Sequence, residues 1–188
     1  MIDLRIKGLP EQINVGNSFF TIKTDFRDWL KFSENLKNED IDFNTISELF
    51  VDELPISTWI MYGGDIVNEL TKFYNNPNAT PRIENDSSSD IVIDYILDGE
   101  YIVGSFMSAY HIDLTNIDMH WHLFKALFLS LPDDTKIRQI MSMRAYKKSN
   151  ESYDQTSSKL KETWRLPDMT DEELDELNEE INNLFYNA

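Results

Sequence analysis

The chain has 188 residues, no cysteine, and 34 acidic against 17 basic residues, which gives a formal net charge of −17. The absence of cysteine excludes disulfides, thiol catalysis and cysteine-ligated zinc or iron–sulfur sites. The negative charge disfavours binding to nucleic acid or to an anionic membrane, and no run of about 18 apolar residues predicts a membrane span.

Residues 2–22 predict strands, and their turn pattern predicts a hairpin. Ile13 and Val15 lead through Gly16–Asn17 into an aromatic and β-branched run that ends at Ile22. Glycine and asparagine between two such runs are typical of a tight hairpin turn. Thr24 then has the character of a helix N-cap, and helical spacing follows it.

Two further helices are predicted before residue 75. A Thr45-x-x-Glu48 pattern indicates a capping box, and the short helix that it opens stops before Pro55. The next helix contains Gly63–Gly64, where we expect a kink because glycine weakens a helix interior. Its predicted apolar positions are Ile60, Ile66, Val67, Leu70, Phe73 and Tyr74.

The chain beyond residue 75 predicts a polar loop followed by helices only. The loop covers residues 76–90, and helical spacing predicts helices over 99–110, 118–130 and 135–146. Residues 147–158 predict a linker, which is followed by a helix around Leu160 and Trp164 and by a final acidic helix. The predicted fold is mainly α, a helical domain with a short N-terminal β-hairpin. We predict one domain with four parts. They are the hairpin and helices of 1–75, the flexible loop 76–90, the helical core segment 91–146, and the linker and acidic helices of 147–188.

Three histidines crowd the segment 94–146, and with Asp113 and Asp118 they suggest a metal site. On a helix, however, His120 and His122 would point about 200° apart and could not share one ion. We therefore predict two exposed helical histidines on either side of a buried Trp121. No P-loop, nucleophile elbow or zinc-protease motif occurs, so we predict no catalytic residue, no cofactor and no metal.

The clearest candidate for partner binding is the C-terminal segment. Its apolar residues step by three, four and three, as in a coiled-coil seam, and residues 168–188 hold eight acidic residues and no basic one. This seam either packs on its own domain or binds a partner helix or another copy of the chain. The apolar face of 118–143 is a second candidate, although its large aromatics favour a core position. The candidate contacts are Trp121, Phe124, Phe128, Leu174, Leu177 and Ile181.

Several segments carry a resemblance to a known family. They are residues 24–32 and the run from Tyr101 to Arg144, in particular 101–106, 109–114, 119–128, 131–135 and 140–144. They resemble the phage gene product fifteen family from siphophages and prophages of Gram-positive bacteria. The chain departs from that pattern at two positions. It has His122 where similar chains often have a second tryptophan, and His111 where they often have glycine.

The resemblance implies a role in phage tail assembly. Genes of this family usually lie between those of the major tail protein and the tape-measure protein, and their products are similar to tail assembly chaperones. The implied function is a non-enzymatic chaperone in the cytoplasm of an infected or prophage-carrying bacterium. It would bind the tape-measure protein and support tail tube and virion morphogenesis, with the major tail protein and a second copy of itself as further candidate partners. The alternatives are a structural virion subunit retained in the finished tail and an enzyme of unrecognised type.

Overall fold

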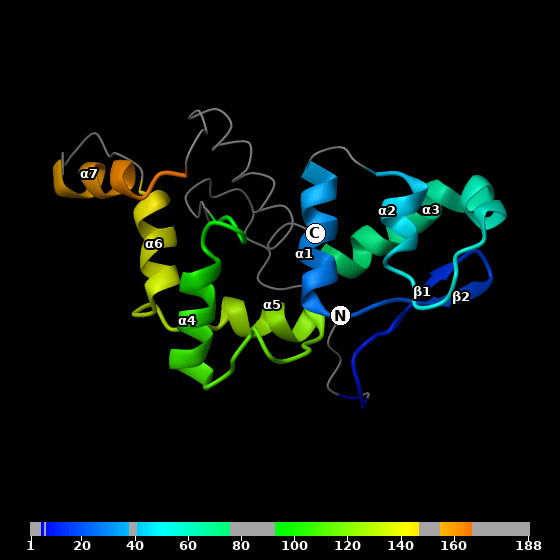
Figure 1. The fold of residues 1–188 in the computed structure, drawn as a ribbon, viewed down its shortest axis with the longest axis horizontal. Coiled ribbons are helices and arrows are strands. Elements are labelled where there is room, and N and C mark those ends of the chain that lie inside the picture. The colour runs from blue at the N-terminus through cyan, green and yellow to red at the C-terminus, as the bar shows by residue number, and fades with distance from the viewer. Residues whose placement is uncertain (1–4, 6, 38–40, 76–92, 147–154, 167–188) are drawn as a thin grey trace. The chain divides into compact units, whose positions relative to one another are not determined.

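The computed structural model describes residues 5, 7–37, 41–75, 93–146 and 155–166 (Figure 1). In these residues the chain forms seven helices and one two-stranded antiparallel sheet, so the predicted mainly α fold with an N-terminal hairpin is confirmed. The elements are β1 (Gln12–Val15), β2 (Ser18–Thr21), α1 (Phe26–Lys37), α2 (Phe43–Ser47), α3 (Ile56–Asn75), α4 (Gly99–Tyr110), α5 (Trp121–Leu129), α6 (Lys136–Arg144) and α7 (Gln155–Thr163).

The chain divides into two compact units that do not follow sequence order. The first unit is built from residues 1–79 together with 118–127, and the second from 80–117 together with 128–187. The first seven residues of α5 therefore belong with the hairpin and α1–α3. The predicted loop at 76–90 lies outside the described residues, and the predicted domain boundaries on either side of it stay a prediction.

The hairpin forms where the sequence predicts it, and its strands are confined to residues 12–21. Val15 pairs with Ser18 across the Gly16–Asn17 turn, and Gly16 has a φ of 62°, which glycine adopts without strain. Ile13 and Val15 are buried, and β1 packs against α3. Phe19 pairs with Asn14 on the opposite face of the hairpin and is 71% exposed.

The caps of two helices differ from the prediction, by one residue in α1 and by three residues in α2. Asp25, and not Thr24, caps α1, because its carboxylate accepts the backbone N–H of Arg27 while the Thr24 carbonyl accepts that of Trp121. In α2 the cap is Asp42. Thr45 is its partner three residues later and completes a reciprocal capping box. The local sequence pattern predicted both helices, but tertiary contacts and the neighbouring aspartates determine which residue is the N-cap.

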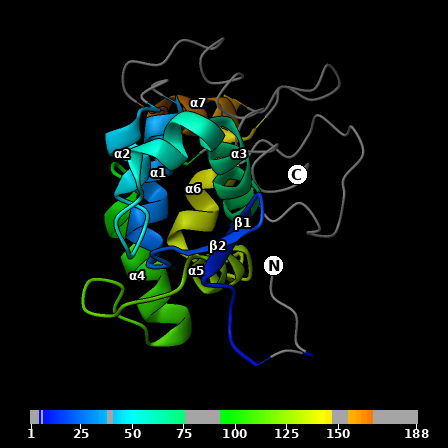
Figure 2. The same ribbon diagram turned by 90° about the vertical axis from the view of Figure 1, so that its right-hand side faces the viewer.

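The kink predicted in α3 is confirmed at Tyr62, one residue before the glycine pair, with φ −130° and ψ 17° (Figure 2). After the kink, Ile66, Leu70, Phe73 and Tyr74 are buried. Before it, Ile60 is 78% exposed, so its predicted place on the apolar face is wrong. The non-helical residue breaks the 3.6-residue phase, and the two parts of α3 present different faces to the core.

The second unit packs α4 against α6 and α6 against α7. The helices predicted over 99–110 and 135–146 are confirmed at α4 and α6, and Ser105 and Phe106 of α4 are buried with Ile137 and Ile140 of α6. The predicted linker over 147–158 is wrong for its last four residues, since α7 begins at Gln155. The predicted final helix, with its seam, lies outside the described residues.

Candidate functional site

The histidine segment is not arranged as the sequence predicts. His120 lies before α5, in an isolated β-bridge with Asp25, and only His122 lies in the helix. The two ring centroids are therefore 5.1 Å apart, and His122 is 4% exposed while His120 is half-buried. The prediction of two exposed rings pointing apart is wrong because it assumed that both histidines are helical.

Each histidine donates to a backbone carbonyl of the first unit. His120 Nδ1 accepts the backbone N–H of His122 at 3.0 Å, so in the neutral ring Nε2 carries the proton and donates to the Pro10 carbonyl at 2.9 Å. His122 Nε2 lies 2.8 Å from the Phe73 carbonyl, which can only accept, so this nitrogen is also protonated. Both Nε2 atoms therefore serve as donors within the fold.

Three side chains of α5 cap the C-terminus of α3. The Trp121 indole donates to the Tyr74 carbonyl at 2.9 Å, and Lys125 Nζ donates to the carbonyls of Tyr74 and Asn75 at 3.1 and 3.0 Å. With His122 on the Phe73 carbonyl, these bonds satisfy groups that have no partner within a helix. We call Trp121, His122 and Lys125 the α3 cap.

Burial sets the charge state of the α3 cap. It lowers the pKa of His122 to about 4 and that of Lys125 to about 8, and it also lowers the pKa of His120. At neutral pH both imidazoles are therefore uncharged. The Lys125 ammonium lies 5.9 and 5.8 Å from the ring centroids of Tyr74 and Trp121, where the aromatic faces favour a cation. The groups that first suggest chemistry thus hold two helices together.

The structure places the predicted central contact residues in the core. Trp121, Phe124 and Phe128 are 0%, 1% and 2% exposed. Trp121 stacks on Tyr74 with ring centroids 4.9 Å apart, and Phe124 stacks on Phe26 at 4.5 Å. This is the core position that the sequence favoured for them. The other predicted contacts, Leu174, Leu177 and Ile181, lie outside the described residues.

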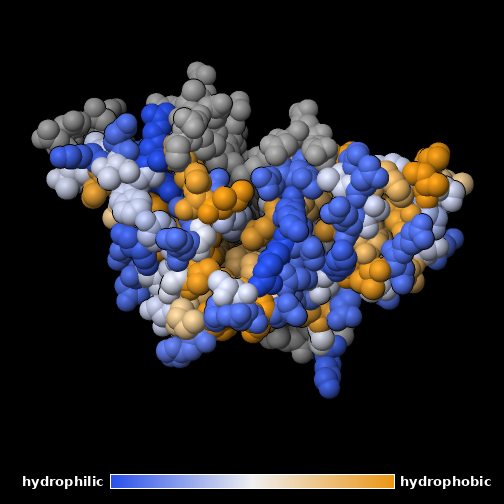
Figure 3. All heavy atoms as spheres, in the orientation of Figure 1, coloured by the Kyte–Doolittle hydropathy of each residue, from blue (hydrophilic) through white to orange (hydrophobic). Residues whose placement is uncertain are grey.

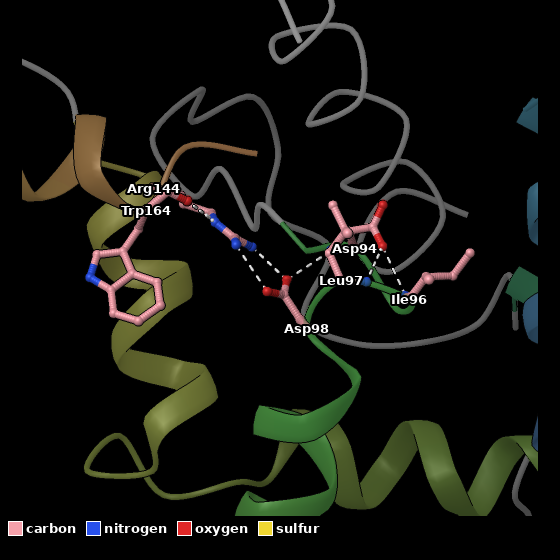
Figure 4. A network of polar contacts seen from close by, with 6 residues as sticks. All are labelled: Asp94, Ile96, Leu97, Asp98, Arg144 and Trp164. Atoms are coloured by element: carbon pink, nitrogen blue, oxygen red, sulfur yellow. Dashed lines mark hydrogen bonds and ion pairs between the residues drawn. The ribbon is translucent and has the colours of Figure 1, made fainter. Parts of the chain in front are cut away.

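A buried ion pair organises the second unit, and no local sequence signal indicates it. Arg144, at the end of α6, donates to both carboxylate oxygens of Asp98, the residue before α4, and its Nε donates to the Trp164 carbonyl at 2.7 Å (Figure 4). Asp98 also accepts the backbone N–H of Asp94 at 3.0 Å. The pair joins residues 46 apart and ties the residue after α7 to α4 and α6. Because every charge has a partner, the network serves as a packing element.

The most exposed apolar surface of the first unit is the start of α3. Five of the twelve exposed large apolar side chains in the described residues fall within residues 51–62. We call four of them the α3 ridge: Ile56, Ile60, Met61 and Tyr62, with exposed fractions of 53%, 78%, 70% and 38%. Hydrophobic side chains gather at this end of the unit, where α3 begins (Figure 3). Contiguous apolar side chains left in water commonly mark a binding surface.

The α3 ridge lies in an acidic stretch of the chain. The described residues 41–66 contain Asp42, Glu48, Asp52, Glu53 and Asp65, all exposed, and no lysine or arginine. Asp52 and Glu53 come shortly before the helix, and Asp65 follows Met61 by four residues, beyond the kink at Tyr62. The candidate site is therefore an apolar ridge, and we call these five carboxylates, which are its neighbours along the chain, the rim.

Comparison with known proteins identifies the family of the chain. Residues 6–166 match the family described as Bacteriophage Gp15 protein. The chain belongs to this family. It is therefore a bacteriophage protein, as the resemblance in the sequence predicted. A search among curated proteins and a search among solved structures each gave no match.

The span matched to the Bacteriophage Gp15 family contains α1–α7, the α3 cap, the ion pair and the α3 ridge. Within the described ranges no group of three or more histidine and carboxylate side chains could hold a metal ion, and none of the helices has the length and apolarity that a membrane span needs. His111 ends α4 with a φ of 56°, a left-handed conformation that glycine adopts more readily than histidine.

Proposed function

We propose that this chain is a phage tail assembly chaperone, a non-enzymatic protein that binds the tape-measure protein in the host cytoplasm and supports morphogenesis of the tail tube. Membership in the Bacteriophage Gp15 family over residues 6–166 is the observation that carries the proposal. The resemblance links such proteins to genes beside that of the tape-measure protein. The major tail protein and a second copy of the chain are further proposed partners.

The physical properties of the chain support this role. A long, helix-rich client exposes apolar stripes until the tail tube encloses it. The α3 ridge offers such stripes an apolar contact that the fold of the first unit leaves open. The net charge of −17 keeps a complex with an apolar client in solution, because charged surfaces resist association.

Co-expression with the cognate tape-measure protein tests the proposal. We expect the tape-measure protein to move from the insoluble to the soluble fraction, and to co-purify with this chain. The control is co-expression of the tape-measure protein with an unrelated acidic protein of similar size, which tests for a general effect of charge. Equal solubility with and without this chain would refute the chaperone role.

Mass spectrometry of purified phage particles separates this role from that of a structural tail subunit. A chaperone leaves when the tube closes around its client, so we expect this chain to be absent or scarce relative to the tape-measure protein. A fixed stoichiometric amount in washed particles would instead identify a subunit of the finished tail.

A further inference from the structure

We propose that the α3 ridge docks an amphipathic helix whose apolar stripe is flanked by lysine and arginine. The inference rests on the proposed function, since it names the chemistry of the client segment that such a chaperone would hold. It goes further by committing to one surface of the first unit and to one kind of partner.

The geometry of the α3 ridge fits a helix. Ile56 and Ile60 are one turn apart and so share a face, and Met61 and Tyr62 widen it. The inner side of the same helix is held by Trp59. Its ring lies 6.2 Å from that of Phe43 and within 3.4 Å of where a Cβ on Gly63 would be. This packing fixes the direction of the exposed residues. A row of side chains at positions i and i+4 forms a ridge that fits between the side-chain rows of a second helix.

The rim selects the charge of the partner. Between residues 41 and 66 the described chain carries five exposed carboxylates and no basic side chain. Asp65, just beyond the kink at Tyr62, and the Asp52–Glu53 pair lie near the two ends of the ridge in sequence. A helix that places lysine or arginine beside its apolar stripe meets opposite charges there, whereas an acidic helix or an anionic membrane surface meets repulsion.

Charge also disfavours two other partners for the α3 ridge, a second copy of the chain and its own C-terminal segment. A second copy would bring an identical acidic rim against the first in a symmetric contact, and like charges placed opposite each other are unfavourable. The apolar seam in residues 168–188 of this chain lies among eight acidic residues and no basic one, so it would meet the rim with the wrong sign. A basic amphipathic helix from another protein is the occupant that satisfies both the apolar and the charged parts of the surface.

Two matched substitutions test the surface. Ile60→Lys alters the ridge, and Ile96→Lys makes the same change in residue and charge at an isoleucine of the second unit that is 73% exposed. The full-length chain and both variants are titrated, by fluorescence anisotropy, into labelled overlapping peptides that tile the cognate tape-measure protein. Circular dichroism and melting temperature verify that both variants fold as the wild type does.

The inference predicts that the peptides bound by the wild type have helical apolar spacing and flanking lysine or arginine. It predicts that Ile60→Lys weakens their binding about tenfold or more, as expected for a central apolar contact, and that Ile96→Lys leaves it unchanged. Rising salt should weaken wild-type binding, because the rim is exposed and its charges are screened.

Four results would overturn the inference: no bound peptide, bound peptides that are acidic, equal effects of the two variants, or a dimer of the wild type that Ile60→Lys dissociates. A truncation at residue 166 that tightens peptide binding would instead make the C-terminal segment the occupant, which also overturns it. The proposed function is judged separately by co-expression. If the tape-measure protein stays soluble with the wild type and equally so with Ile60→Lys, the chaperone role stands and the α3 ridge is not its surface.

Discussion

Replacement of His122 by glutamine should reverse the order of stability between wild type and variant as the pH falls. His122 is 4% exposed and its pKa is lowered from 6.5 to about 4, first by burial. Between these two values the unfolded chain binds a proton that the folded chain does not, so stability falls as the pH falls. Glutamine keeps an N–H that can reach the Phe73 carbonyl but does not titrate.

The magnitude follows from the two pKa values. One pKa unit corresponds to about 1.4 kcal/mol, so the lowering of the His122 pKa by about 2.5 reduces the stability of the wild type by about 3 kcal/mol once the pH is below 4. At about pH 5 the reduction in stability has already reached about 2 kcal/mol. The variant is free of this loss. It gives up the stacking of the His122 ring on Phe73, whose centroids are 4.4 Å apart, which is worth about 1 kcal/mol at any pH. The variant should therefore be less stable by about 1 kcal/mol at neutral pH and more stable by a similar amount at about pH 5.

Urea denaturation followed by tryptophan fluorescence measures this difference, because Trp29, Trp59 and Trp121 lie in the same unit as His122. His120 faces His122 and also contributes to acid sensitivity, and it is present in both proteins. His111→Gln, the same substitution at an exposed histidine, serves as the control. The reasoning fails if wild type and His122→Gln lose equal stability between neutral pH and about pH 5.

Three further changes probe the fold. Asp98→Ala leaves the buried Arg144 guanidinium without its carboxylate and should lower the free energy of unfolding by about 3–5 kcal/mol. In urea titrations, the double variant Asp98→Ala/Arg144→Met should lose less stability than the sum of the losses of the two single variants. Additive losses would contradict the pairing. His111→Gly removes the strain of a left-handed backbone conformation at the end of α4 and should stabilise the protein by about 0.5–1 kcal/mol. The melting temperature should then rise by about 2 °C, and a lower melting temperature would show that the strain is absent. Gly64→Ala, at a helical glycine where an added Cβ would meet nothing within 4 Å, should stabilise by a similar amount, and a loss of stability would show that the bend in α3 requires this glycine.

Local signals in the sequence were sufficient to predict much of the fold. The Gly16–Asn17 turn located the hairpin, helical spacing located α4 and α6, and Gly63–Gly64 located the kink to within one residue. These features depend on the conformational preferences of neighbouring residues. The sequence alone is therefore enough to predict the hairpin, these helices and the kink.

The arrangement of the candidate site depends on contacts between distant residues, which spacing does not encode. The start of α5 is set by the bridge from His120 to Asp25, and the Met119 N–H bonds to a carboxylate 94 residues away, so the two histidine rings meet instead of diverging. Arg144 likewise finds Asp98 only through the packing of α4 on α6. The exposure of Ile60 results from a break in helical phase at Tyr62. A periodic pattern alone would have placed that residue inside.

The central claim concerns the fate of the tape-measure protein in cells that produce phage. The most direct measurement is the amount of soluble tape-measure protein, together with an electron-microscopy count of tailed particles, after a stop codon is placed in the gene for this chain. The chaperone account predicts that the tape-measure protein becomes insoluble, that tails disappear, and that both recover when the wild-type chain is supplied in trans. Normal tails and soluble tape-measure protein in the absence of this chain would contradict it.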